Sequence, residues 1–427
     1  MTVPLSSKIW ASTETKGFNS AVNRFLSMWQ LGFFFHEMGF GLLSIFLPLY
    51  IITIGGSLID IGVLSAVALL VAIPASFFWG YMCDRTRRYK LYILVSFLSS
   101  TILLYTLSLT RSINVLILLY VVLSFLHVAH EPPKNVLIAE LYSRADWEKS
   151  FAFYESFTEV GWLVGLVLGF ITSFSGGYSE FSLLLCSVLN LIAFGTSLFL
   201  VTDPSLIFER SLVNLEKSVD FAHRGVLLAS RIFDGASVTG KLRRENVNAL
   251  CVGLILFSLA TSILFTPMPI FVSSAVNAAG LSSSFVFMLF ILNSCGGICG
   301  YVFAGRRSTN QAQRTDLTRV VVFRGFLSFL LLSVFFSMVA VYNVGIIATI
   351  LVLMGFAYAL FIVYTLSLSM ELIPSGKSGL FNVLIGIGGA IGSFVGPLIA
   401  AQTVSFAYVF ITAGIIFFAA YSAFRVL

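Results

Sequence analysis

Long apolar runs, separated by short polar breaks, follow one another along most of this chain. A helix needs about 20 apolar residues to cross the hydrocarbon core of a bilayer, and twelve runs approach or exceed that length. They lie near residues 27–53, 59–83, 91–109, 113–141, 149–174, 181–202, 247–273, 282–304, 319–338, 342–370, 378–400 and 405–424. The pattern predicts an all-α, polytopic membrane protein with twelve transmembrane helices.

One polar stretch is much longer than the other breaks. It covers residues 203–246 and divides the chain into two parts, 1–202 and 247–427, each with six apolar runs. This arrangement predicts two six-helix bundles joined by a central loop. Within the loop, residues 206–233 mix apolar and charged side chains at loosely helical spacing, which suits either an amphipathic helix on the membrane surface or a plain linker.

The composition excludes a soluble globular protein. Of 427 residues, 58% are apolar and 10% are charged, whereas soluble domains carry roughly 25% charged residues. Because so few charges cannot cover a water-facing surface, lipid is the solvent for most of the chain. The net charge of +6 belongs to loops on one side of a membrane and does not indicate a nucleic-acid partner.

Positive charges predict the orientation of the spans, because cytoplasmic loops are enriched in Lys and Arg. With both termini in the cytoplasm, the breaks on that side contain nearly all the Lys and Arg residues, and the breaks on the other side contain only Arg111. The opposite orientation would place most of the positive charge outside. We therefore predict a multi-pass protein of the cell membrane with both termini and the central loop in the cytoplasm.

Three motifs occur twice, in the same order in the two parts. GYMCDRTRR begins at Gly80 and a degraded copy, GYVFAGRRS, begins at Gly300. The other pairs are Glu140-Leu141 with Glu371-Leu372, and Gly161 and Gly165 with Gly392 and Gly396. Glycines four residues apart let helices pack closely. The common order predicts duplicated bundles with the same orientation in the membrane.

The first motif resembles the loop signature of the major facilitator superfamily, G-x-x-x-D-R/K-x-G-x-R/K-R/K. Four positions match it: Gly80, Asp84, Arg85 and Lys90. Two positions depart from it, because Arg87 stands at the second glycine and Tyr89 at the first closing basic position. The resemblance covers essentially the whole chain. It implies two bundles that rock about a central site, a cavity lined by helices 1 and 4, and a monomer.

The same loop is the expected cytoplasmic gate, which comprises Gly80, Asp84, Arg85, Arg88 and Glu140. Gly80 would let two helix ends approach closely. Asp84 would contact the positive N-terminus of a helix across the interface between the halves, and the resemblance implies that this is helix 11, which starts near Ser378. Arg85 or Arg88 would pair with Glu140 at the end of helix 4. The alternative is that the basic residues only set the topology.

Ionisable residues inside spans are rare and commonly functional, and here they concentrate in the first half. They share a level near mid-membrane on helices 1, 4 and 5: His36, Glu37, His127, His130, Glu131, Lys134, Glu155 and Glu159. The four on helix 4 have i, i+3, i+4 and i+7 spacing, so they lie on one face. Pro132 and Pro133 interrupt that face and predict a kink, which frees the carbonyls of Val128 and Ala129.

Three hypotheses fit this cluster. In the first, a carboxylate carries a transported proton, with Glu37 and Glu131 ahead of Glu159, and burial and the charge of Lys134 act on it in opposite directions. In the second, the His and Glu residues bind a transition-metal or other cation, although most of these ligands share one helix. In the third, Lys134 only neutralises Glu37 or Glu159, and the network is structural.

The second half has almost no ionisable residue in its spans. The exceptions are Arg324, expected near the inner end of helix 9, and Glu371. Its cavity wall is expected to consist of aromatic, Met and Asn side chains, which suit weakly polar organic molecules. These residues are Asn248, Phe265, Met268, Phe290, Asn293, Tyr358 and Tyr364.

Together these observations predict a secondary active transporter that moves a small organic solute by alternating access, with a proton as the coupling ion. The sequence has no Gly-rich nucleotide-binding loop, so ATP-driven pumping is unsupported. We expect no cofactor and no resident metal. The alternatives are a metal or cation transporter, a membrane sensor of this fold that no longer transports, and a membrane enzyme, for which no nucleophile constellation is present.

Overall fold

The computed structural model describes residues 27–141, 147–174, 179–203, 247–306, 310–336, 339–372, 379–403 and 405–426. Within these residues, twelve helices are long and apolar enough to cross a membrane. The described part of the chain contains helices and no strand. The predicted all-α, polytopic architecture is therefore confirmed.

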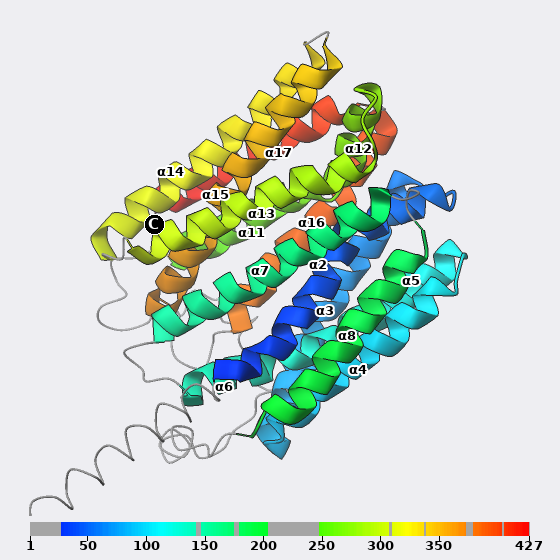
Figure 1. The fold of residues 1–427 in the computed structure, drawn as a ribbon. Coiled ribbons are helices and arrows are strands. Elements are labelled where there is room, and N and C mark those ends of the chain that lie inside the picture. The colour runs from blue at the N-terminus through cyan, green and yellow to red at the C-terminus, as the bar shows by residue number, and fades with distance from the viewer. Residues whose placement is uncertain are drawn as a thin grey trace, which may run out of the picture.

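The first bundle is drawn in blue to green in Figure 1. Its elements are η1 (Ser27–Trp29), α2 (Gln30–Thr53), α3 (Leu58–Thr86), α4 (Tyr89–Ser108), α5 (Ile113–His127), η2 (Val128–His130), α6 (Glu131–Leu141), α7 (Trp147–Phe174) and α8 (Phe181–Leu200). Helix α2 packs against α7 and α8, and α4 packs against α5 and α8. The fourth span is thus built from α5, η2 and α6 in succession.

The second bundle, green to red in Figure 1, repeats this arrangement. Its elements are α11 (Val247–Phe265), α12 (Met268–Ala278), α13 (Ser284–Arg306), α14 (Asn310–Leu330), η5 (Leu331–Phe335), α15 (Ala340–Leu372), α16 (Gly379–Thr403) and α17 (Phe406–Arg425). Helix α11 packs against α16 and α17, and α14 packs against α15 and α17. The packing partners correspond span by span, as the repeated motifs predict.

The interruption of the fourth span follows from its prolines. Pro132 has no N–H to donate to the Val128 carbonyl. The Glu131 N–H donates to that carbonyl instead, which closes the 3₁₀ turn η2. Side chains three residues apart eclipse one another in such a turn, so it directs His127 and His130 to the same side. The helix is thus interrupted at the predicted place, but the Val128 carbonyl, which we expected to be free, accepts the Glu131 N–H.

The seventh span differs from the single helix over 247–273 that the sequence predicts. Helix α11 ends at Phe265, and α12 begins after Pro267 and continues to Ala278. Pro267 and Pro269 lack N–H donors, so the hydrogen-bond ladder of an α-helix cannot run through this segment.

The repeated glycines bring helices into backbone contact within each half. A side chain on Gly161 or Gly165 of α7 would collide with the backbone of α2. A side chain on Gly392 or Gly396 of α16 would collide with the backbone of α11. In each half, therefore, the fifth span lies directly on the first, which confirms the close packing expected from the motif.

Contacts between the two halves contradict one expectation about the gate. We call the end of the molecule that carries Arg85–Arg88 the basic end. Toward the opposite end, Gly62 of α3 lies against Pro397 of α16, and Gly169 of α7 lies against Phe287 of α13. Near the basic end, a side chain at Gly80 would meet nothing within 4 Å. The close approach of helix ends predicted at Gly80 is absent from the described residues in this conformation.

Arg87 ends α3 in a left-handed conformation. Its φ is 56° and its ψ is 26°, and among the described residues it is the non-glycine with positive φ. This conformation costs an L-residue about 1–2 kcal/mol, so glycine is preferred where a helix ends in this way. The loop signature of the superfamily has its second glycine at this position. Arg87 therefore replaces a glycine at the point where the backbone is strained.

We expect Arg87→Gly to raise the free energy of unfolding by up to about 1 kcal/mol, because relief of strain exceeds the entropic cost of glycine. Arg88 is the matched control, since it is also exposed but has an ordinary φ of −104°. Arg88→Gly should lower stability slightly. The measurement is the thermal unfolding midpoint of each purified variant; a midpoint below wild type for Arg87→Gly would contradict this account.

Candidate functional site

A cavity of about 610 Å³ lies between the two bundles. Its wall is formed by α2, α3, α5 and α7 with η2 on one side, and by α11, α12, α13 and α16 on the other. Among the described residues of this wall, the carboxylates and the imidazole all come from the first bundle: Glu37, His127 and Glu159. The cavity therefore has one ionisable side and one neutral side.

Glu159 of α7 reaches from the first bundle to the second. Its Oε1 accepts a hydrogen bond from Ser294 Oγ of α13, with an oxygen–oxygen distance of 2.5 Å. Both side chains line the cavity. A titratable carboxyl thus takes part in a hydrogen bond that joins the two halves.

Glu37 of α2 also lines the cavity. Within the described part of the chain, its carboxylate makes neither a hydrogen bond nor an ion pair. Glu37 and Glu159 therefore face the same space from two helices of the first bundle.

Lys134 of α6 is the centre of a separate ion-pair network. Its Nζ lies 2.6 Å from Glu131 Oε2 and 3.9 Å from Glu155 Oε1. It also lies 5.3 Å from the centroid of the Tyr154 ring. The structural hypothesis paired Lys134 with Glu37 or Glu159, but the structure pairs it with Glu131 and Glu155. Among the described residues, no ion pair within 4 Å joins Lys134 to Glu37 or to Glu159.

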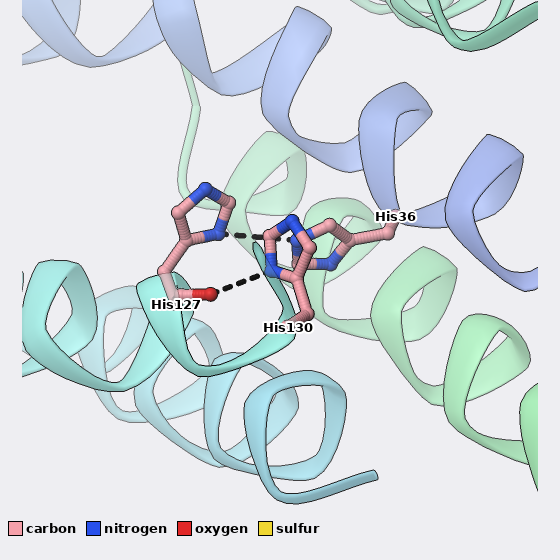
Figure 2. Close-up of side chains that lie close together, drawn as sticks. All are labelled: His36, His127 and His130. Atoms are coloured by element: carbon pink, nitrogen blue, oxygen red, sulfur yellow. Dashed lines mark hydrogen bonds between the residues drawn. The ribbon is translucent and has the colours of Figure 1, made fainter. Parts of the chain in front are cut away.

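The three histidines form a compact group (Figure 2). His36 belongs to α2, His127 ends α5 and His130 ends η2. The ring centroids of the three pairs lie between 4.8 and 4.9 Å apart. His36 Nε2 lies 3.1 Å from His127 Nδ1, and His130 Nδ1 lies 2.6 Å from the His127 carbonyl oxygen. The structure thus brings together the imidazoles that the sequence placed at one level.

The predicted gate residues lie at the basic end. Asp84, Arg85 and Arg88 are exposed, and an Arg85 guanidinium nitrogen donates to the Tyr81 hydroxyl at 3.3 Å. The side chain of Glu140 and residues 373–378, which include the start of helix 11 near Ser378, lie outside the described part of the chain. Their pairing with Asp84 and the arginines stays a prediction.

The wall from the second half differs from the aromatic surface that the sequence predicts. Phe265, Phe290 and Asn293 do line the cavity. The other four residues are not part of its described lining: Asn248 is exposed at the start of α11, Met268 and Tyr364 are buried, and Tyr358 contacts Arg324. These helices are apolar all round, so their sequence does not reveal which face meets the cavity.

Small hydroxyl side chains occupy much of this neutral wall instead. They are Thr261, Ser262, Thr266, Ser294 and Ser393. The sequence interpretation missed them, because a hydroxyl in an apolar helix commonly bonds to a carbonyl of its own helix and gives no functional signal. Thr266 Oγ1, just beyond the end of α11, donates to Ser393 Oγ of α16 at 3.2 Å.

Two polar atoms of the neutral wall lack a partner. Thr261 Oγ1 and Asn293 Oδ1 are buried and make no hydrogen bond within the described structure, and both residues line the cavity. Buried polar atoms are nearly always hydrogen-bonded in folded proteins. Each of these two atoms thus keeps a hydrogen-bonding capacity that no described residue uses.

Arg324 of α14 is completely buried behind this wall, with 0% of its surface exposed. Its guanidinium carbon lies 4.9–5.6 Å from the centroids of four aromatic rings, those of Phe257, Phe265, Tyr358 and Phe417. None of its three side-chain nitrogens has a hydrogen-bond partner among the described residues. The ninth span covers Asp316–Phe335, so Arg324 lies near its middle. The sequence-based prediction, which placed Arg324 near the inner end of this span, was wrong.

A family model described as Major Facilitator Superfamily matches residues 31–397. This chain belongs to the major facilitator superfamily. Among solved structures, a mutant of nucleoside transporter NupG is similar, with a TM-score of 0.69 and 14% identity over 94% of this chain and 99% of that chain. A mutant of peptide transporter POT in complex with sulfate has a TM-score of 0.67 and 15% identity over 94% and 95%. None of the curated proteins compared with this chain matches it in sequence.

In this superfamily member, the two halves place different chemistry where equivalent spans meet. In the first half, spans 1, 3, 4 and 6 bring together His36, Ser96, His127, His130 and Asn190. In the second half, spans 7, 9, 10 and 12 bring together Phe257, Arg324, Tyr358 and Phe417. The duplicated architecture thus carries an imidazole group in one half and a caged guanidinium in the other.

Proposed function

We propose that this protein moves a small, polar, uncharged organic solute by alternating access and couples that movement to a proton. The observation that carries the proposal is the hydrogen bond from Ser294 to Glu159 inside the cavity. Its donor and acceptor belong to different bundles. Rocking that separates α7 from α13 would remove the bond and so change the proton affinity of Glu159.

Such a conformation-dependent proton site is what coupling requires. A ligand shifts a conformational equilibrium only by binding the two states with different affinity, and a proton on Glu159 meets this condition. Glu37 shares the cavity and is the second expected carrier. Glu131, ranked with Glu37 on sequence, is less suited, because its carboxylate is already ion-paired with Lys134.

The neutral wall supports the choice of solute. The cavity volume of about 610 Å³ lies within the range typical of small-molecule sites, about 300–1,000 Å³. Hydroxyls, an amide and the two unpartnered atoms Thr261 Oγ1 and Asn293 Oδ1 suit a molecule that offers hydrogen-bond donors. Nucleosides are the first compounds to try, since one fold neighbour is named as a nucleoside transporter. Peptides, the class named for another neighbour, carry charged termini and serve as the contrasting class.

The test is a thermal-shift screen of purified protein with such solutes at several pH values, followed by counterflow in liposomes. We expect a solute that raises the unfolding midpoint, exchanges across the membrane and accumulates when a pH gradient is imposed. Binding without counterflow would indicate a sensor that no longer transports. Counterflow that never responds to a pH gradient would remove the proton from the proposal.

The proposed orientation places the basic end in the cytoplasm. In a variant without native cysteines, Arg224→Cys in the central segment should resist an impermeant thiol reagent added to intact cells, because that segment faces inward. Ser112→Cys, in the exposed loop at the opposite end, is the matched control and should react. Labelling of the cysteine at position 224 in intact cells would overturn this topology.

A further inference from the structure

Three of the four histidines of the sequence meet inside the first bundle, in a group whose bonding is specific. One nitrogen from each of His36, His127 and His130 lies within 4.8 Å of those from the other two. His36 and His130 are 0% and 1% exposed, and His127 lines the cavity. We infer that these three imidazoles bind a divalent transition-metal ion of the zinc class.

Hydrogen bonds around His36 fix which of its nitrogens can bind a metal. The Asn190 amide nitrogen donates to the Cys186 carbonyl, so Asn190 Oδ1 is the acceptor that faces His36. His36 Nδ1–H donates to this oxygen at 2.6 Å. The lone pair is therefore on Nε2, which faces His127 at 3.1 Å. Metal-binding histidines are typically held by such a partner on the other ring nitrogen.

His130 is held in the same manner (Figure 2). Its Nδ1 lies 2.6 Å from the His127 carbonyl oxygen, which can only accept, so Nδ1 carries the proton. In the neutral ring, Nε2 then has the lone pair. This nitrogen lies 3.3 Å from Glu131 Oε1. The carboxylate accepts a hydrogen bond from this nitrogen when the ring is protonated. A metal ion bound to Nε2 would take the place of that hydrogen beside the carboxylate.

Zinc geometry is compatible with the spacing of the group. Nitrogens bound tetrahedrally at about 2.0–2.1 Å from zinc lie on the order of 3.4 Å apart. The closest pair, His36 Nε2 and His127 Nδ1, is 3.1 Å apart, and the widest separation of 4.8 Å must close by roughly 1.4 Å through side-chain rotation. Binding through His127 Nδ1 needs the lone pair on that nitrogen, so the proton that Nδ1 donates to His36 Nε2 moves to Nε2 of the same ring, and His127 stays neutral.

The ion is a resident of the protein and not its cargo. All three ligands belong to the first bundle, on α2, α5 and η2, so rocking of the two halves leaves them together. Transported solutes are bound between the halves. The ion instead ties the first span to the fourth. Its path of entry is the cavity, because His127 forms part of the wall.

Metal binding by the purified, full-length protein tests this inference. After removal of metals with a chelator, we expect saturable binding of Zn²⁺ by calorimetry and a higher thermal unfolding midpoint with Zn²⁺. Co²⁺ should give the intense visible absorption of a tetrahedral, nitrogen-ligated site. His127→Ala should weaken Zn²⁺ binding by at least about 100-fold. His223→Ala, the fourth histidine and outside the described residues, is the control and should bind as wild type does.

Two results would overturn the inference. The first is the absence of both saturable Zn²⁺ binding and the Co²⁺ spectrum in wild-type protein. This measurement does not depend on any variant. The other is an unchanged Zn²⁺ affinity in a folded His127→Ala variant. Neither result bears on Glu159, whose carboxylate is not a ligand of the site.

Discussion

Glu159→Gln should abolish pH-driven accumulation of the solute while leaving counterflow exchange intact. The amide cannot carry a proton, but its oxygen still accepts the hydrogen bond from Ser294 Oγ, so the contact between the bundles survives. Solute exchange needs only the rocking of the two halves, whereas accumulation needs the proton as well. We expect accumulation to fall to the level of liposomes without a pH gradient.

Glu155→Gln is the matched control. Glu155 lies one turn away on the same helix, but its carboxylate faces Lys134 at 3.9 Å and is not among the described residues of the cavity wall. This variant should keep pH-driven accumulation. Loss of accumulation in Glu155→Gln with retention in Glu159→Gln would transfer the coupling role to the Lys134 network.

Arg324→Met should raise the free energy of unfolding by about 1–4 kcal/mol, because it replaces a buried charge without an ionic partner by an apolar side chain of similar length. All three side-chain nitrogens of Arg324 lack hydrogen bonds in the described structure. The four aromatic rings around it supply cation–π attraction, but this is about 0.5–2 kcal/mol each and does not replace the hydration of a guanidinium. The thermal unfolding midpoint should rise by several degrees.

Arg319→Met is the control for this change, since Arg319 is on the same helix and its side chain is 73% exposed beside Asp316. An exposed ion pair contributes little, so this variant should unfold within about a degree of wild type. A midpoint for Arg324→Met several degrees below wild type would show that the guanidinium stabilises the fold, contrary to the expectation.

The spans were predictable because a single physical requirement sets them. Each crossing needs about 20 apolar residues, and the breaks at Gly55–Ser57 and Arg87–Arg88 are polar enough to mark the ends. The contact between Glu131 and Lys134 in helix 4 was also predictable, because helical geometry places residues one turn apart on the same face. The break of the seventh span at Pro267 carried a signal, but proline alone does not separate a kink from a terminus.

Contacts between helices could not be predicted in the same way. Nothing in the sequence relates Ser294 to Glu159, which are 135 positions apart. Lys134 pairs with Glu131 and Glu155 and not with Glu37 because of how the helices are rotated about their axes. Uniformly apolar helices do not encode this rotation in their hydrophobic pattern. For the same reason Tyr358 was expected on the cavity wall but contacts Arg324.

We propose that solute and proton move together through the cavity that Glu159 lines. The most direct measurement is the internal pH of liposomes that contain the protein and a pH-sensitive dye, with a solute gradient and no initial pH gradient. We expect the solute gradient to change the internal pH with wild-type protein and to leave it unchanged with Glu159→Gln. Solute movement without any change of pH in wild type, or an equal change in the variant, would contradict it.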